Sequence, residues 1–207
     1  MFGKPMDTGP QGSGGPWLAW SARGTQDRRI NPQRFYIRDK DGNKNELPEN
    51  VGLILDITTL KTGYQEDTGG MKGVAPKWAL GADPSRMPER PGDNWKAGFQ
   101  IRVAVSNDEA VDWHQAGAAV WNAICDLSAH PETGPAGTLP LVRLTGGEEM
   151  NFGNGSTVKP ILVVEKWVPT PDCLKVGMPD VQPAATQATP PPAAQPASTE
   201  GVQSHGF

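Results

Sequence analysis

Apolar and polar residues alternate most regularly in residues 99–105 (FQIRVAV), between Gly98 and the pair Asn107-Asp108. A period of two is typical of a strand with one buried face. Comparable runs, rich in branched or aromatic residues, predict further strands at 17–23, 34–38, 51–60, 139–145 and 161–168. The last of these is apolar on both faces, which is typical of a central strand.

One helix is predicted within residues 113–127. Apolar residues follow there at helical spacing and form one stripe: Trp113, Gly117, Val120, Ile124 and Leu127. Asp108 or Asp112 is expected to cap the start of the helix, and Pro131 is expected to end it. We expect Trp113 and Trp121 to pack in the core.

The predicted order is three strands, a long loop at 61–98, a strand, the helix and two strands. Loops of this length are uncommon in compact domains unless they have a function. The pattern predicts a mainly β fold with one main helix: an OB-fold-like small antiparallel barrel with a long inserted loop. A β-sandwich with one helix fits almost as well.

Composition divides the 207 residues into a domain at 17–175, a flexible lead at 1–16 and a tail at 176–207. Between Val181 and Ala197 there are five Pro and six Ala and no charge, so the tail is expected to be disordered. No run approaches the roughly 18 apolar residues of a membrane span, and no apolar stretch suggests a secretory signal in the lead. Cys125 and Cys173 do not suggest a disulfide scaffold or zinc site, which favours the cytoplasm.

Charge is distributed unevenly along the chain. Residues 21–40 contain six cations and two anions, although the whole protein has a net charge of −4. Trp17 and Trp20 precede this basic run, and Phe35 and Tyr36 lie inside it. Cations neutralise phosphates and flat side chains stack on bases, so the run predicts a site for single-stranded nucleic acid. The alternative is a solvated face with aromatic residues in the core.

Alternation within 34–38 places Arg34, Tyr36 and Arg38 on one face of a strand, and Phe35 and Ile37 on the other. A ring between two cations suits a base between its phosphates. Alternatively, Tyr36 is half-buried and the arginines pair with nearby acids, Asp39, Asp41 or Glu46.

The predicted nucleic-acid-binding residues are of two kinds. Phosphate contacts are expected from Arg23, Arg28, Arg29, Arg34 and Arg38, with Lys61, Lys77 and Arg102 as weaker candidates. Stacking contacts are expected from Trp20, Tyr36, Tyr64 or Trp78. We expect Trp17 and Phe35 in the core, because alternation sets each opposite its neighbouring aromatic residue.

Motifs for catalysis or metal binding are not found in the sequence. The histidines, at 114, 130 and 205, do not form a zinc pattern, and neither a phosphate-binding nor a nucleophile motif is present. Glu148-Glu149 are expected in a solvated turn. Residues 39–43 resemble the start of a calcium loop, but Lys44 and Asn50 occupy the positions that need Gly and Glu. We therefore expect no enzymatic activity, no cofactor and no metal.

Five stretches resemble phage- or prophage-encoded single-stranded DNA-binding proteins: 16–39, 96–105, 114–127, 139–146 and 159–174. The resemblance implies an OB-type core that binds displaced DNA strands during replication or recombination in the bacterial host cytoplasm. It also implies a tail that recruits partner proteins. Such tails end in an acidic tip with a terminal aromatic residue, whereas this one has Phe207 with only Glu200 nearby.

A second hypothesis is a structural or assembly protein of the virion, whose basic run contacts a partner chain. The distribution of cations separates the two. DNA binding requires Arg23, Arg28, Arg34 and Arg38 to converge with exposed rings in one groove, whereas scattered cations favour assembly. A homo-oligomer is compatible with either hypothesis.

Overall fold

Strands dominate the computed structural model, which describes residues 15–25, 29–69, 76–81, 86–129, 133–153 and 155–175. The chain divides into two compact units, Met1–Gly177 and Met178–Phe207, and all described residues lie in the first. The predicted tail and residues 1–14 of the predicted lead fall outside the described residues.

The strands are β1 (Trp17–Ser21), β2 (Arg34–Arg38), β3 (Lys44–Glu46), β4 (Gly52–Glu66), β5 (Trp78–Leu80), β6 (Trp95–Ala104), β7 (Ala110–Ala116), β8 (Thr138–Phe152) and β9 (Gly155–Pro169). The helices are α1 (Ala118–Ser128) and α2 (Asp172–Lys175).

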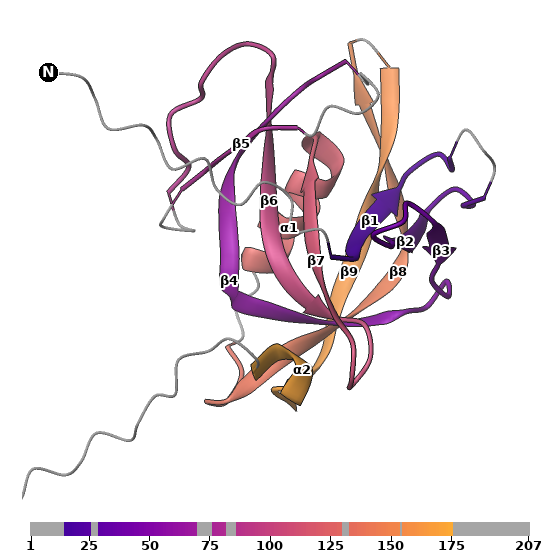
Figure 1. Ribbon diagram of the computed structural model, residues 1–207, viewed down its shortest axis with the longest axis vertical. Helices are drawn as coiled ribbons and strands as arrows, with labels where there is room; N and C mark the ends of the chain where they lie inside the picture. The colour runs from indigo at the N-terminus through magenta and orange to yellow at the C-terminus, as the bar shows by residue number, and fades with distance from the viewer. Residues whose placement is uncertain are drawn as a thin grey trace, which may run out of the picture. The chain divides into compact units, whose positions relative to one another are not determined.

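In the described part of the chain these strands form one nine-stranded sheet in the order β3-β2-β1-β7-β6-β4-β8-β9, with β5 paired to β4. Neighbours are antiparallel except β1 and β7, which are parallel. The sheet curls into an open half-barrel, and α1 lies behind β6 and β7 in Figure 1. The prediction of a mainly β fold is confirmed.

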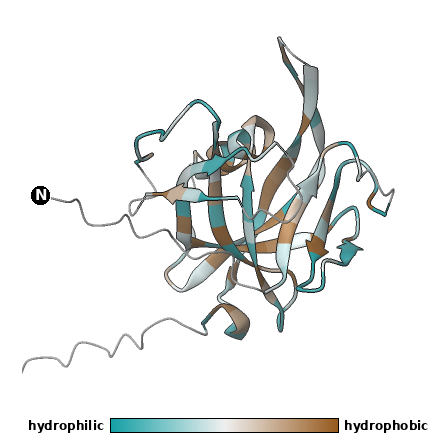
Figure 2. Ribbon diagram, turned by 45° about the horizontal axis from the view of Figure 1, so that its top comes forward, coloured by the Kyte–Doolittle hydropathy of each residue, from teal (hydrophilic) through white to brown (hydrophobic). Residues whose placement is uncertain are grey.

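The core lies on the concave face of the sheet, which we call the core face; the opposite face is the outer face. Apolar side chains from β1, β2, β4, β6, β7 and β8 meet there with Val120 and Ile124 of α1. Hydrophobic and hydrophilic residues alternate along the strands (Figure 2), because successive side chains point to opposite faces. The outer face is therefore available to contact a ligand.

The predicted helix is wrong at its start, over residues 113–116. Residues 110–116 form β7, which pairs with β6 across the turn at Asn107-Asp108. Trp113 is buried as predicted, but it enters the core from this strand. The helix begins after Gly117, whose φ of 123 suits glycine, and no side chain caps it, so neither Asp108 nor Asp112 has the predicted role.

Other differences concern the ends of the sheet. The predicted long loop contains β5, and the predicted turn around Glu148-Glu149 belongs to the extended strand β8. The predicted central strand, β9, lies at an edge of the described sheet. Its two apolar faces have different surroundings, because α1 packs against β9 while Ile161 and Val163 are exposed.

Candidate nucleic-acid interface

Strand β2 presents its side chains in the register that the sequence predicted. Phe35 and Ile37 are 0% and 8% exposed and belong to the core, whereas Arg34, Tyr36 and Arg38 point to the outer face. The two faces of β2 are therefore chemically distinct, with apolar side chains on one and two cations flanking a ring on the other.

The predicted roles of the first two tryptophans are reversed. Trp20 is 4% exposed and packs against Phe35 in the core, with ring centroids 5.1 Å apart. Trp17 is half-buried on the outer face, where it pairs in register with Arg38. The two residues do lie on opposite faces, as expected, but Leu18 and Trp20 face inward together. Trp17 is thus available for stacking and Trp20 is not.

Four half-buried rings from four strands follow one another across the outer face. The centroid of Trp17 lies 6.3 Å from that of Tyr36 and 5.3 Å from that of His114. Trp78 of β5 meets His114 edge-on at 6.2 Å. We call Tyr36, Trp17, His114 and Trp78 the ring row. Its spacings are those of interacting aromatic pairs, so the rings form one continuous surface.

Cations lie along the ring row. The guanidinium of Arg38 lies 5.8 Å from the ring centroid of Trp17, within cation–π range. Lys61, exposed on β4, pairs in register with Gln100, which pairs with His114. Lys77 precedes Trp78, and its 73% exposed side chain forms a 3.6 Å ion pair with Glu66. Several of the predicted phosphate contacts thus lie beside stacking surfaces.

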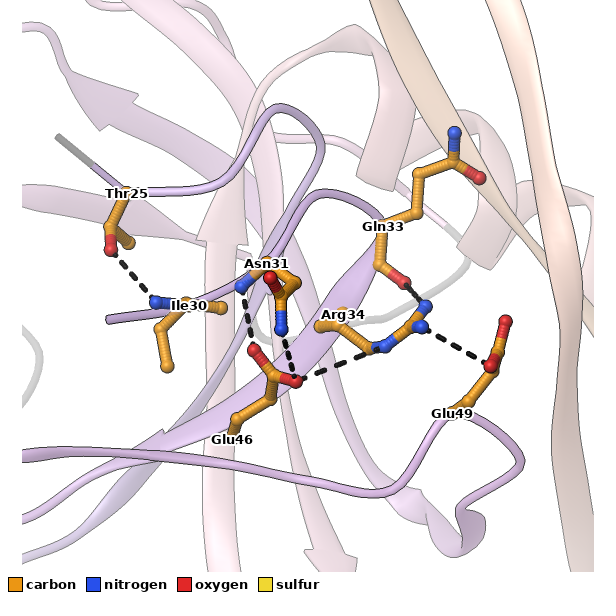
Figure 3. Close-up of polar contacts among 7 residues, drawn as sticks. All are labelled: Thr25, Ile30, Asn31, Gln33, Arg34, Glu46 and Glu49. Atoms are coloured by element: carbon orange, nitrogen blue, oxygen red, sulfur yellow. Dashed lines mark hydrogen bonds and ion pairs between the residues drawn. The ribbon is translucent and has the colours of Figure 1, made fainter. Parts of the chain in front are cut away.

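Arg34 has a different environment from Arg38 (Figure 3). Its guanidinium lies 3.2 Å from Glu49 and 3.9 Å from Glu46, and it donates to the carbonyl of Gln33. Hydrogen bonds from Asn31, and then the charge of Arg34, hold the pKa of Glu46 below its usual value. Arg34 is therefore engaged with acids, as the alternative hypothesis for β2 expected.

Most of the remaining predicted residues do not gather at the ring row. Arg23 donates to the backbone carbonyl and hydroxyl of Ser156 in β9, while Arg29 is exposed and Arg28 lies outside the described residues. Arg102 pairs in register with Asp112, which pairs with Trp17, so Arg102 lies beside the ring row, but its guanidinium lies 3.4 Å from the carbonyl of Cys173 in α2. Tyr64 lines a separate groove. Arg23 therefore does not converge with Arg34 and Arg38 in one groove, which is the arrangement that the DNA-binding hypothesis requires.

The surroundings of His114 favour the uncharged form of its ring. Burial lowers its pKa below the ordinary histidine value, and the nearby carboxylate of Asp112 opposes this only in part. A neutral imidazole between two indoles adds a flat surface without repelling Arg38. This residue was missed because the sequence placed it on a helix, whereas alternation within 110–116 would have set it opposite Trp113.

The described residues contain no group of three or more His, Cys, Asp or Glu side chains able to hold a metal ion. Asp39 instead closes its own turn, because its carboxylate accepts from the backbone of Asp41 and from both nitrogens of Asn43. Among the helices described, none is long and apolar enough to cross a membrane.

Comparisons with models of protein families, with curated proteins and with solved structures found no match to this chain.

Proposed function

We propose that this protein binds single-stranded DNA with little sequence preference, through the ring row and the cations beside it. The observation that carries the proposal is the contact of Arg38 with Trp17 inside a continuous row of half-buried rings. Every base has a π-face, so stacking on such a row tolerates any sequence. The exposed cations along it suit the phosphates that separate successive bases.

The strand connections support an OB-type core within the proposal. An OB-fold is a small, partly open barrel of five strands. Strand β4 pairs with β6 and β8, β6 pairs with β7, and α1 connects β7 to β8, which pairs with β9. Backbone pairing does not close these five strands into a barrel in the described residues, because β9 lies at an edge of the sheet and β7 pairs with β1.

The proposed biological setting is phage-type DNA replication or recombination in a bacterial host. It rests on the five sequence stretches named above and on the chemistry of the ring row, which suits a transiently displaced strand. Recruitment of replication or recombination proteins by residues 176–207 is part of the same proposal.

The test is a titration of labelled oligo-dT at two salt concentrations. For single strands, the logarithm of affinity should fall with the logarithm of salt concentration with a slope near −0.7 per neutralised phosphate. Trp17→Ala and Arg38→Ala should weaken binding, and Arg38→Ala should also make the salt slope shallower. Lys166→Ala, which removes an exposed cation from β9, is the matched control and should bind normally. An absence of binding at low salt would contradict the proposal.

The scattered cations favour the second hypothesis, a virion assembly protein that contacts a partner chain. Arg23 and Arg34 are engaged within the protein, and β9 exposes Ile161 and Val163 at the edge of the described sheet. Exposed apolar residues on an edge strand are suited to pairing with another chain. This hypothesis predicts a defined oligomer without affinity for DNA, which light scattering and the same titration would reveal.

A further inference from the structure

We propose that a groove beyond the end of the ring row is a second contact region for the same DNA strand. This inference rests on the proposed function. The groove, called here the end groove, is a hollow of ≈ 680 Å³ whose walls include Tyr64, Arg90, Trp95, Lys96, Trp121 and Phe152. Nothing in the sequence brings these residues together, because they lie in β4, the segment before β6, β6, α1 and β8.

The rings of the end groove come from four structural elements. Tyr64 and Trp95 come from the neighbouring ends of β4 and β6, and Trp121 comes from the first turns of α1. Phe152, at the last position of β8, is 48% exposed. A large apolar ring that is so exposed can stack on a ligand without giving up contacts within the protein, and stacking buries more of its surface.

The charge of the end groove suits a polyanion. Arg90 and Lys96 lie on its walls, and the first turn of α1, which also lines it, contains no acidic residue. Lys96 lies 2.6 Å from Asp67, and the hydrogen bond from Lys96 is the main reason why the pKa of Asp67 is lowered. A phosphate would compete with this exposed carboxylate for Lys96. Asp67 therefore limits the attraction of the groove for DNA.

The end groove meets the ring row at the end of β7, although its rings Tyr64 and Trp95 lie on the core face of the sheet and the ring row lies on the outer face. His114 and Ala116 are two positions apart on the same face of β7, about 7 Å along the strand. Ala116 already belongs to the lining of the groove, and its partner in β6 is Gly98. Only small residues therefore separate the two surfaces on these strands. A strand that stacks on His114 can pass over them and around the end of β7 into the groove.

The occupant follows from this continuity and from the aromatic walls. An isolated small ligand would need an enclosed pocket with convergent polar groups, whereas the rings here are distributed around an open hollow beside a cationic rim. Successive bases of one single strand match both features. The inference predicts that the binding footprint is longer than the ring row alone requires.

The experiment compares fluorescence anisotropy of labelled oligo-dT of about 6 and about 16 nucleotides, near the two ends of the range of OB-type site sizes. Trp95→Ala and Phe152→Ala should lower the affinity for the long oligonucleotide on the order of tenfold each, the effect of removing one stacking ring. They should leave the affinity for the short one unchanged. Val163→Ala, which trims an exposed apolar residue on β9, is the control.

A second arm of the experiment tests for a gain of affinity and does not depend on removing a ring. Asp67→Asn releases Lys96 from its carboxylate partner, so it should raise the affinity for the long oligonucleotide only. Because Asp67 is exposed, this variant is expected to fold normally, and circular dichroism checks all variants.

The outcomes separate the two proposals. If the wild-type protein binds neither oligonucleotide, the proposed function fails. If it binds both, and neither the ring variants nor Asp67→Asn changes the affinity for the long one, only the end groove is refuted. Equal losses for both lengths would refute its role as a second contact region.

Discussion

The indole nitrogen of Trp20 in β1 donates a 2.9 Å hydrogen bond to the backbone carbonyl of Val158 in β9. These two strands do not pair with each other in the described sheet. Arg23, just beyond β1, also donates to Ser156 in β9. Side chains thus join β1 to the far edge of the sheet, where backbone hydrogen bonds would close a complete barrel.

Replacing Trp20 with Phe should lower the free energy of unfolding by about 1–3 kcal/mol, because the carbonyl of Val158 loses a partly buried donor. Urea denaturation measures the change. The matched control is Trp17→Phe on the outer face, which should change stability much less. A larger loss of stability in Trp17→Phe than in Trp20→Phe would mean that the indole of Trp17, and not that of Trp20, stabilises the fold.

The two neighbouring aromatic residues of β2 should respond in opposite ways to truncation. Phe35→Ala should destabilise the fold by about 3–5 kcal/mol, because Phe35 is fully buried. Tyr36→Ala should weaken binding of oligo-dT by about 1–3 kcal/mol and have a smaller effect on stability. Thermal unfolding and titration distinguish these effects, and the reverse result would mean that the register of β2 is wrong by one residue.

Arg34 and Arg38 lie on the same face but should contribute unequally to binding. Arg38 is exposed over Trp17, so Arg38→Ala should reduce affinity for DNA and make the salt slope shallower by about 0.7 per lost phosphate contact. Arg34 is held between Glu46 and Glu49, so Arg34→Ala should have the smaller effect. Equal losses in a titration at several salt concentrations would show that DNA displaces these acids.

The lowered pKa of His114 predicts how stability depends on pH. The unfolded chain protonates this histidine near its ordinary pKa of about 6.5, whereas the folded protein takes up the proton only at lower pH. Between these two values the unfolded state binds more protons. The free energy of unfolding should therefore fall as the pH falls below about 6.5.

His114→Gln should flatten the dependence of the free energy of unfolding on pH between about pH 7 and pH 5. Urea denaturation at a series of pH values would measure it. The carboxyl groups with lowered pKa, Asp39, Glu46, Asp67 and Asp172, contribute at more acidic pH, because their ordinary values already lie near 4. An unchanged slope in the variant would mean that His114 does not titrate differently in the folded protein.

The sequence alone determined which residues share a face within one strand. Strict alternation set Phe35 and Ile37 apart from Arg34, Tyr36 and Arg38, because successive side chains of a strand point to opposite sides. Local pattern also placed Trp17 and Trp20 on opposite faces. It did not decide which of them faced inward, since that depends on the pairing of Trp20 with Phe35 across β1 and β2.

Tertiary structure decided the features that depend on residues distant in sequence. Local spacing assigns residues 113–116 to the helix, whereas pairing with β6 makes them part of β7. The ring row combines Tyr36, Trp17, His114 and Trp78 from four strands, so no local window contains it. The end groove likewise combines Tyr64, Trp95 and Phe152. Such surfaces arise only when curling of the sheet brings remote strands together, and no local periodicity encodes that curvature.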